Sequence, residues 1–391
     1  MLRALAVANY RSLRRLVVPL AGLTVITGPN GSGKSSVYRA LRLLAETASG
    51  GVVRSLAREG GLASVLWAGP DTISRAMRAG EVPVQGTGRR RDPLQLRLGF
   101  SADGDDEFGY AIEVGLPQPP VSPFFALDPE IKAEAVFTGP VARPATLLTR
   151  RHGALLQVRG DGGWQVVERR IPAWSSMLAE FADPAVAPEM LRLREQVRGW
   201  RFHDHFRSDE MAPARLPQVG TRTPVLGHDG GDLASAIATL REIGDSEAFH
   251  AAVEDAFPGS RVEVEARHGQ LETLMHQPGL LRPLRAAELS EGTLRYLLLV
   301  TALLSPRPAP LLVLNEPEAS LHPDLLPALG RLIGRAAQVS QVVVVTHSAR
   351  LAGALESDAG ADQCRLTLEK VLGETTVAGD LDPPAWQWPA R

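Results

Sequence analysis

The sequence predicts an α/β protein with a parallel core sheet, an antiparallel β subdomain and a helical lobe. Two near-continuous apolar runs, residues 311–315 and 341–347, alternate with helical patterns, which is typical of parallel strands buried on both faces. A short β-branched run, Leu23–Thr27, precedes a glycine-rich loop and a helical pattern. Alternating segments fill the middle of the chain and indicate antiparallel strands.

The composition is that of an ordinary soluble globular protein. The 391 residues are 44% hydrophobic and 22% charged, enough for one large domain or two. No apolar run reaches the ~18 residues that a membrane span needs, and we see no signal peptide. Cys364 is the single cysteine, which excludes an internal disulfide and a cysteine-based zinc site. We therefore expect a cytoplasmic protein with no membrane contact.

Charge gives little indication of a nucleic-acid partner, because the formal net charge is -2. Two basic clusters, at residues 11–15 and 89–91, are of the kind that is usually solvated surface. Lysine is scarce, whereas arginine is common. The lysines are Lys34, Lys132 and Lys370. Because arginine is used elsewhere, we expect the lysine at position 34 to have a chemical role.

Local patterns predict the elements of the first two thirds of the chain. The N-terminus indicates strand, turn and strand, and a helix is expected over 35–46. Alternation on both sides of a turn predicts three β-hairpins, at 94–114, 154–169 and 261–276. Helical spacing predicts helices at 187–197 and 232–243. The acidic turn at 103–107 is either a solvated hairpin tip or a cation site.

The last hundred residues alternate helix and strand. We expect a helix over about 291–304, the strand 311–315, a helix after Pro323, the strand at 341–347 and a helix after Ser348. The apolar stretch around 294–304 is interpreted as a buried helix. The chain has no internal repeat and no long heptad pattern, so a coiled-coil arm is not expected.

The stretch GPNGSGKS, residues 28–35, fits the phosphate-loop pattern G-x-x-x-x-G-K-[ST]. Its glycines let main-chain N–H groups point inward around phosphates. Lys34 would place its charge on the β- and γ-phosphates, and Ser35 would offer its hydroxyl to Mg²⁺. The alternative is a chance glycine-rich loop. The predicted nucleotide-binding residues here are Gly28, Pro29, Asn30, Gly31, Ser32, Gly33, Lys34, Ser35 and Ser36.

A second polar pair follows the apolar strand in LVLNEPE. Glu316 lies just past the strand end, where a carboxylate can polarise a water molecule for in-line attack. In nucleotide hydrolases, the residue before this glutamate is normally Asp and supports Mg²⁺, often through a bound water. Here it is Asn315. We predict Glu316 as the catalytic base, and Ser35 and Asn315 as the metal-site residues.

Two further segments are weak signals alone, and their order along the chain supports a functional role. LSEGT, residues 289–293, opens a strongly apolar helix, and Ser290 is a good N-cap; alone it indicates only a capped helix. THS, residues 346–348, follows an apolar strand, where His347 can either sense a γ-phosphate or be structural. The four segments run in the order phosphate loop, LSEGT, strand with Asn-Glu, strand with THS.

In this order the motifs resemble those of ABC-type ATPases. The narrower resemblance is to the RecF/OLD-like group of AAA-type ATPases, relatives of the SMC head domains. It rests on NYRSL at 9–13, on LSEGT in place of LSGGQ and on EPEASLHP at 316–323. GGDLASAIATL, residues 230–240, is similar to the group's G-x-N-L-A segment, with Asp232 in place of Asn. The resemblance is loose between about 50 and 220.

The resemblance implies a P-loop NTPase fold with an ABC-type head that binds ATP and Mg²⁺. Residues 28–35 correspond to the Walker A loop, and Asn315 with Glu316 to the Walker B pair. His347 corresponds to the switch histidine, so that Glu316, His347 and Lys34 are the expected catalytic residues. The implied domain is a single one, with a lobe at about 1–170 and 305–380, an inserted helical lobe at about 171–304 and a tail at 381–391.

The resemblance also implies a second copy of the chain. Ser290 and Gly292 correspond to the signature, which in this group closes on the γ-phosphate held by the other subunit. The geometry requires a head-to-tail homodimer on ATP binding, with residues 318–322 as the D-loop at its seam. A coupling glutamine is expected too, and Gln95 and Gln118 are its candidates.

Asn315 raises the question of whether the site is active. It keeps the shape of Asp and an oxygen acceptor but carries no charge, so it should hold Mg²⁺ less well, by about 1–3 kcal/mol. A decayed enzyme would be expected to have lost Lys34 or Glu316 as well. We expect slow hydrolysis; the alternative is ATP binding without turnover.

Two roles for such a switch remain open. The first is a DNA-transacting ATPase in repair, recombination or genome defence, for which the aromatic and basic residues of GWRFHDHFRSDE, 199–210, could stack on bases; the alternative is a buried aromatic strand. The second is a regulatory subunit that restrains a partner nuclease or toxin. Only 44 residues follow His347, so we expect a nuclease to come from another chain.

A transporter's energising subunit is a third role, against which the missing LSGGQ and the EPEASLHP segment argue. The tail DPPAWQWPAR, residues 382–391, is either a docking segment for a partner or a frayed terminus.

Overall fold

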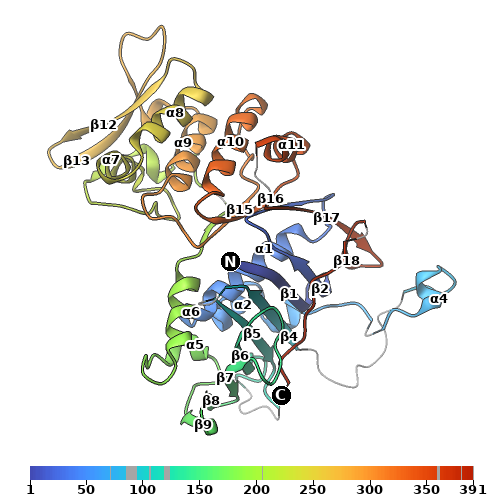
Figure 1. Cartoon of the computed structure of the whole chain (residues 1–391). Helices are drawn as coiled ribbons and strands as arrows, with labels where there is room; N and C mark the ends of the chain where they lie inside the picture. Colours follow the sequence, from blue (N-terminus) through green and yellow to red (C-terminus); the bar gives the residue numbers. More distant parts are fainter. Residues whose placement is uncertain are drawn as a thin grey trace. The chain divides into compact units, whose positions relative to one another are not determined.

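The computed structural model describes residues 1–70, 72–84, 95–104, 107–118, 124–204, 206–358, 362–379 and 381–390 (Figure 1). The chain forms two compact units. The first contains Met1–Ala21, Gly28–Trp200 and Cys364–Arg391, and the second contains Gly22–Thr27 and Arg201–Gln363. The predicted phosphate loop therefore opens the second segment of the first unit. The expected division into lobes stays a prediction.

An antiparallel sheet of eight strands organises the first unit, in the order β2-β1-β4-β5-β6-β7-β8-β9. Both hairpins predicted here are confirmed: β4 pairs with β5 through Leu96↔Val114, and β8 pairs with β9 through Gly160↔Gly163. Every residue of β5 is buried, as expected for a central strand covered on both faces. The strands are β1 (Leu2–Tyr10), β2 (Leu13–Pro19), β4 (Leu96–Ala102), β5 (Phe108–Gly115), β6 (Glu130–Thr138), β7 (Leu147–His152), β8 (Leu155–Gly160) and β9 (Gly163–Glu168).

The predicted helices of this unit are confirmed at 35–46 and 187–197, as α1 (Lys34–Glu46) and α6 (Pro188–Arg198). Short elements that the sequence did not indicate also belong to it. They are η1 (Thr47–Ser49), α2 (Val52–Arg58), α3 (Leu62–Val65), α4 (Arg75–Arg78), α5 (Met177–Glu180) and the hairpin of β17 (Gln363–Val371) with β18 (Glu374–Val377).

A buried ion pair crosses the middle of this sheet. Arg151 and Glu134 are 0% and 2% exposed, and their Nη1 and Oε2 atoms lie 2.8 Å apart. Glu134 also accepts hydrogen bonds from the Tyr110 hydroxyl, the Ser176 hydroxyl and the Met177 N–H. Burial of a charged pair is costly unless the remaining donors and acceptors are matched, and here several of them are.

The C-terminal tail lies on the chain's own sheet. The Trp386 ring packs edge-on against Phe137 of β6 at 6.0 Å between centroids, and against Trp388 at 5.2 Å. Both tryptophans join a small apolar cluster with buried residues of β5, β6 and β7. The expectation of a frayed terminus is therefore wrong for this part of the tail, because two large aromatic side chains anchor it.

Four parallel strands form the sheet of the second unit, where β10, β15, β16 and β3 neighbour one another in that order. The registers Asn315↔Val345 and Val345↔Ile26 align the carboxyl ends of three of them. The predicted parallel sheet is thus confirmed. The strands are β10 (Arg201–His203), β15 (Leu311–Asn315), β16 (Gln341–Val345) and β3 (Leu23–Thr27).

Helices and a small antiparallel sheet complete the second unit (Figure 1). The hairpin predicted at 261–276 is confirmed as β12 (Arg261–Arg267) with β13 (Gln270–His276), joined by β11 (Gln218–Val219) and β14 (Leu284–Arg285). The predicted helices are confirmed too. The helices are α7 (Leu233–Ile243), α8 (Ser246–Ala256), α9 (Glu291–Leu303), α10 (Leu326–Ala336) and α11 (Ala349–Asp358), with the short turns η2 (Pro213–Arg215), η3 (Ala286–Glu288) and η4 (Pro323–Leu325).

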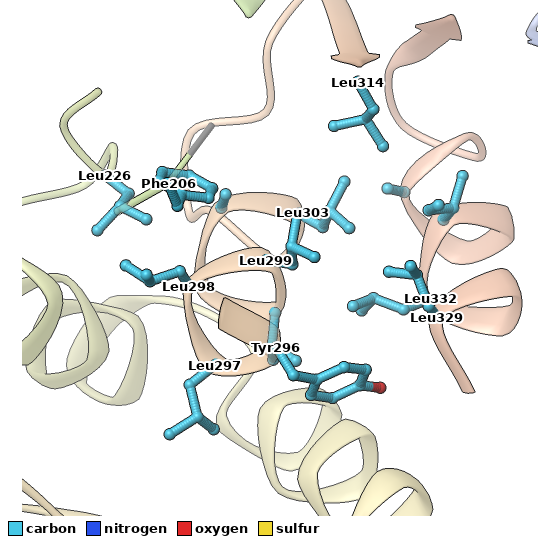
Figure 2. Packing of buried hydrophobic residues seen from close by; sticks show 14 of the residues in the cluster. Phe206, Leu226, Tyr296, Leu297, Leu298, Leu299, Leu303, Leu314, Leu329 and Leu332 are labelled. Atoms are coloured by element: carbon cyan, nitrogen blue, oxygen red, sulfur yellow. The ribbon is translucent and has the colours of Figure 1, made fainter. Parts of the chain in front are cut away.

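Helix α9 is the centre of this unit's core. All residues from Leu294 to Leu303 are buried, so the helix is covered around its whole circumference. Figure 2 shows Leu298 pointing towards Phe206 and Leu226, whereas Leu299 and Leu303 point towards the side chains of α10. Within the described residues, no helix is both long and apolar enough to cross a membrane.

Of the two interpretations of residues 199–210, the buried aromatic strand is confirmed and the base-stacking surface is wrong, because the aromatic rings are buried. Trp200, Phe202 and Phe206 are 5%, 6% and 3% exposed, and Phe202 belongs to the parallel strand β10. Of the basic clusters, Arg11 and Arg14 are paired with acidic partners, Glu59 and Glu374. Residues 89–91 lie outside the described residues.

His203 of β10 should make stability depend on pH. Burial, together with the nearby charges of His228 and Arg201, lowers the pKa of His203 to about 4, against about 6.5 in an unfolded chain. Between these values the unfolded state binds more protons, so stability should fall as the pH falls from about 6.5 to 4, by up to about 3 kcal/mol, and the effect should level off below.

Urea unfolding across this pH range tests the expectation. His203→Phe keeps a ring beside Phe206, which it stacks on at 5.0 Å, and removes the titrating group. The same change at His250, an exposed residue of α8, is the control and should leave the pH slope as it is. An equal slope in wild type and His203→Phe would contradict the assignment.

Candidate functional site

The phosphate loop connects the end of β3 to the start of α1. Gly33 has φ 107° and a Cβ there would collide with the Thr375 side chain, so only glycine fits. The Thr375 hydroxyl donates to the Ser32 carbonyl at 2.8 Å and lies 2.8 Å from the Ser12 hydroxyl. The hairpin β17–β18 and the NYRSL turn therefore hold the loop in place. The sequence motifs did not indicate these contacts.

Two side chains of the loop are directed inward. Lys34 is 6% exposed, and its Nζ donates to the carbonyls of Gly28 at 2.5 Å and Pro29 at 3.1 Å. The Ser32 hydroxyl is buried without a hydrogen-bond partner. Ser35 and Asn30 are exposed, and the Ser36 N–H bonds the Gly33 carbonyl. A buried cation and an unpartnered buried hydroxyl on one loop suit the binding of phosphate oxygens.

In the second unit, main-chain pairing of the parallel strands brings Asn315, Glu316 and Thr346 to one edge of the sheet, where the strands have their carboxyl ends. The Glu316 N–H bonds the Val345 carbonyl at 2.7 Å, and the Thr346 N–H bonds the Ile26 carbonyl at 3.0 Å. Asn315 and Glu316, at the end of β15, and Thr346, at the end of β16, thus lie at the same edge of two neighbouring strands. In the chain, Gly28, the first residue of the phosphate loop, follows the last residue of β3 directly.

Glu316 and His347 lie next to each other at this edge. The His347 Nδ1 atom is 3.6 Å from the Glu316 carboxylate and 3.4 Å from that of Glu318. The side chains of His347 and Glu316 are 52% and 43% exposed, so both can reach a ligand. Glu316 has φ 49°, a backbone conformation that non-glycine residues adopt mainly where their surroundings hold them in it.

The amide oxygen of Asn315 is buried and has no hydrogen-bond partner. An unmatched buried acceptor is costly. It fits the expected role of holding a water molecule bound to Mg²⁺, since an amide oxygen is an adequate acceptor for that water. Among the described residues, no group of three or more histidine, cysteine or acidic side chains is placed to hold a metal alone.

Glu318, which the sequence placed in the D-loop, fixes the segment that carries the switch histidine. Glu318 is 8% exposed. Oε1 accepts hydrogen bonds from the Thr346 hydroxyl at 2.5 Å, the His347 N–H at 3.1 Å and the Ser348 N–H at 3.2 Å. Sequence motifs did not reveal this contact, because the three partners lie about thirty positions away, just after strand β16.

The signature segment, residues 289–293, begins helix α9. The Ser290 hydroxyl accepts from the Thr293 N–H at 3.1 Å, so the predicted N-cap is confirmed. A Cβ on Gly292 would lie 2.9 Å from the Ser320 carbonyl, so the signature lies close against the D-loop turn. One turn further, buried Arg295 donates from Nη2 to the Glu316 carbonyl at 3.4 Å.

The structure places the remaining candidate residues but assigns them no role in the site. The Gln95 carbonyl accepts from Asn9, and Gln118 is exposed; neither is assigned as the coupling glutamine. Residues 105 and 106 of the acidic turn lie outside the described residues, while Asp103 and Glu107 pair with Arg3 and the N-terminus. Asp232 accepts from the Gly227 N–H, which closes the turn before α7.

Known proteins match this chain in sequence and in fold. The family described as “AAA domain, putative AbiEii toxin, Type IV TA system” matches residues 23–161 and 165–352. A stretch of 44 residues, 11% of this chain, is 48% identical to the “OLD nuclease” of Thermus scotoductus. The match spans only 8% of that protein's length.

Two solved structures show the same fold. One is an SMC head bound to the C-winged helix domain of ScpA, with TM-score 0.51, 15% identity and 96% of each chain covered. The other is an SMC head with an extended coiled coil bound to the C-terminal domain of ScpA, from Pyrococcus furiosus, with TM-score 0.50, 13% identity and 96% and 95% covered. The predicted fold class and the predicted resemblance are therefore confirmed.

The two glutamates of this edge should differ in their effect on stability. Glu318→Ala removes the acceptor of the buried Thr346 hydroxyl and of the His347 N–H, and should lower the free energy of unfolding by about 1–3 kcal/mol. Glu316→Ala, at a half-exposed side chain, should change it by less than about 0.5 kcal/mol. Urea unfolding measures both. Equal stability of the two variants would mean that Glu318 does not hold residues 346–348.

Proposed function

We propose that this chain, which belongs to the AAA-domain family matched above and is a P-loop ATPase of the SMC/OLD-like kind, is an ATP-dependent dimerisation switch. In this proposal it binds ATP with Mg²⁺, pairs with a second copy and separates after hydrolysis. The observation that carries the proposal is the shared edge of β15, β16 and β3, where Asn315, Glu316 and His347 lie; the phosphate loop follows β3 in the chain.

Nucleotide binding is assigned to the loop at residues 28–36. Main-chain N–H groups and the buried Ser32 hydroxyl would bind phosphate oxygens, and the Lys34 ammonium would exchange its carbonyl partners for the β- and γ-phosphates. Ser35, the exposed first-turn residue of α1, would contact Mg²⁺. The N-terminus of α1 adds its dipole to the attraction.

Hydrolysis is assigned to the Glu316 carboxylate, which would accept a proton from the attacking water. The adjacent His347 would hold the γ-phosphate end of the substrate and orient Glu316, from which its ring nitrogen is 3.6 Å away. Asn315 would support the metal through water, with its unpartnered amide oxygen. Mg²⁺ supplies charge neutralisation when bound, and the uncharged Asn315 holds it less strongly than Asp would. We therefore propose slow turnover rather than none.

Dimerisation is assigned to the signature segment. Ser290 is exposed and Gly292 partly so, so both are free to face a nucleotide that another copy holds. An arrangement in which each copy cradles one nucleotide and caps the other is a closed two-fold dimer. The positive φ of Ser320, 61°, and its contact with Gly292 link the D-loop turn to the same surface.

Of the two roles, regulation of a partner protein now has the better support. The aromatic side chains that were to stack on DNA are buried, and two arginines of the N-terminal basic cluster are paired. The DNA-transacting role, in repair or genome defence, is supported only by the family resemblance. Pull-down with an ATP-trapped variant separates them: a co-purifying nuclease or toxin supports regulation, whereas salt-dependent DNA binding that needs ATP supports the first role.

Glu316→Gln should abolish turnover and trap the dimer. The amide cannot accept the proton, so phosphate release should fall at least about 100-fold, while ATP and Mg²⁺ should convert the protein to a dimer in analytical ultracentrifugation. Glu242→Gln, the same change at a side chain that is 61% exposed, should leave both properties at the wild-type level. Unchanged phosphate release in Glu316→Gln would refute Glu316 as the base.

A further inference from the structure

One buried arginine holds the main chain that leads into the signature segment. Arg215, in η2, is 7% exposed. Its guanidinium makes five hydrogen bonds, each to a main-chain carbonyl: Ser208 at 2.8 Å, Asp209 at 2.8 Å, Ala286 at 3.1 Å, Ala287 at 3.2 Å and Leu289 at 2.7 Å. Two stretches of chain more than seventy residues apart are thereby fixed to one side chain.

These carbonyls need such a donor. Residues 286–288 form a single short turn, η3, after which Leu289 and Ser290 are extended with ψ 146° and 156°. The Ala286 carbonyl receives the Leu289 N–H at 3.4 Å, which is a long hydrogen bond. Ala286 and Leu289 are 2% and 4% exposed, so water has little access. A planar guanidinium can serve several carbonyls at once, whereas an ammonium presents one compact donor.

The last of these contacts lies at the signature itself. Leu289 is its first residue, and its carbonyl makes the shortest of the five bonds, immediately before the N-cap Ser290. A second brace stiffens the same stretch from outside: Arg282 binds Glu288 at 2.6 and 2.8 Å, and Glu288 accepts from the Arg285 N–H. The outer pair is solvent-exposed and should contribute little, which leaves Arg215 as the main fixed point.

We propose that Arg215 is a positioning residue that presets the signature segment for capture of the nucleotide held by a second copy. This rests on the proposed dimerisation. Arg215 does not touch the nucleotide in this account; it removes the cost of ordering residues 286–293 when the dimer closes. Its loss should weaken dimerisation and leave nucleotide binding to the phosphate loop of one copy unchanged.

The test places Arg215→Lys in the Glu316→Gln background. With ATP and Mg²⁺, the dimer dissociation constant should rise about 10- to 100-fold, whereas the affinity of the monomer for a fluorescent ATP analogue should stay the same. Arg222→Ala is the control, because Arg222 is 80% exposed and pairs with Glu242 on the same unit; it should change neither. An unchanged dimer constant for Arg215→Lys would overturn the proposal.

Hydrogen exchange of the nucleotide-free protein provides a second, independent readout. Arg215→Lys should speed exchange of the amides of residues 286–293, and Arg222→Ala should not. If Glu316→Gln itself fails to dimerise, the proposed switch is wrong, but faster exchange would still support Arg215 as the residue that orders this segment. Unchanged exchange in a folded Arg215→Lys protein would contradict it.

Discussion

The main-chain pairing of β15, β16 and β3 is the constraint on which the site in the second unit depends. Its register brings the ends of the three strands level, and the bonds Glu316 N–H to Val345 and Thr346 N–H to Ile26 extend the ladder by one residue beyond the strands. A slip of one residue would turn the side chains to the opposite face. Because these strands are apolar and buried on both faces, the cost of a slip would come from drawing the polar end residue Asn315 into the buried sheet, and this keeps the polar residues at the edge.

Buried charges then hold the turns that carry the predicted site residues. Glu318 bonds the turn with His347, Arg295 bonds the Glu316 carbonyl, and Arg215 bonds the chain before Ser290. A buried charge is costly to desolvate, and it is tolerated where many hydrogen bonds meet it. Each of these side chains acts on main-chain groups, so each fixes a backbone shape, including the left-handed conformation of Glu316.

The sequence predicted those features that repeat along a short stretch. Apolar runs and alternation identified the parallel strands, the three hairpins and α9, because strand and helix periods are local properties. Contacts between distant segments were not predictable in this way: Thr375 at the phosphate loop, Glu318 at residues 346–348 and Arg215 at the signature each act across many positions. The aromatic segment at 200–206 shows the limit of a local pattern, since its spacing fits both an exposed stacking surface and the buried strand that it contains.

The central claim is that one copy of the chain cradles the nucleotide and another copy caps it. Mixing two inactive variants tests it most directly: Lys34→Ala, which disables the cradle, and Ser290→Arg, which blocks the cap at an exposed position. A mixed dimer has one composite site with both parts intact, so the mixture should release phosphate although neither variant does so alone. A mixture as inactive as its components, with both variants folded, would contradict the account.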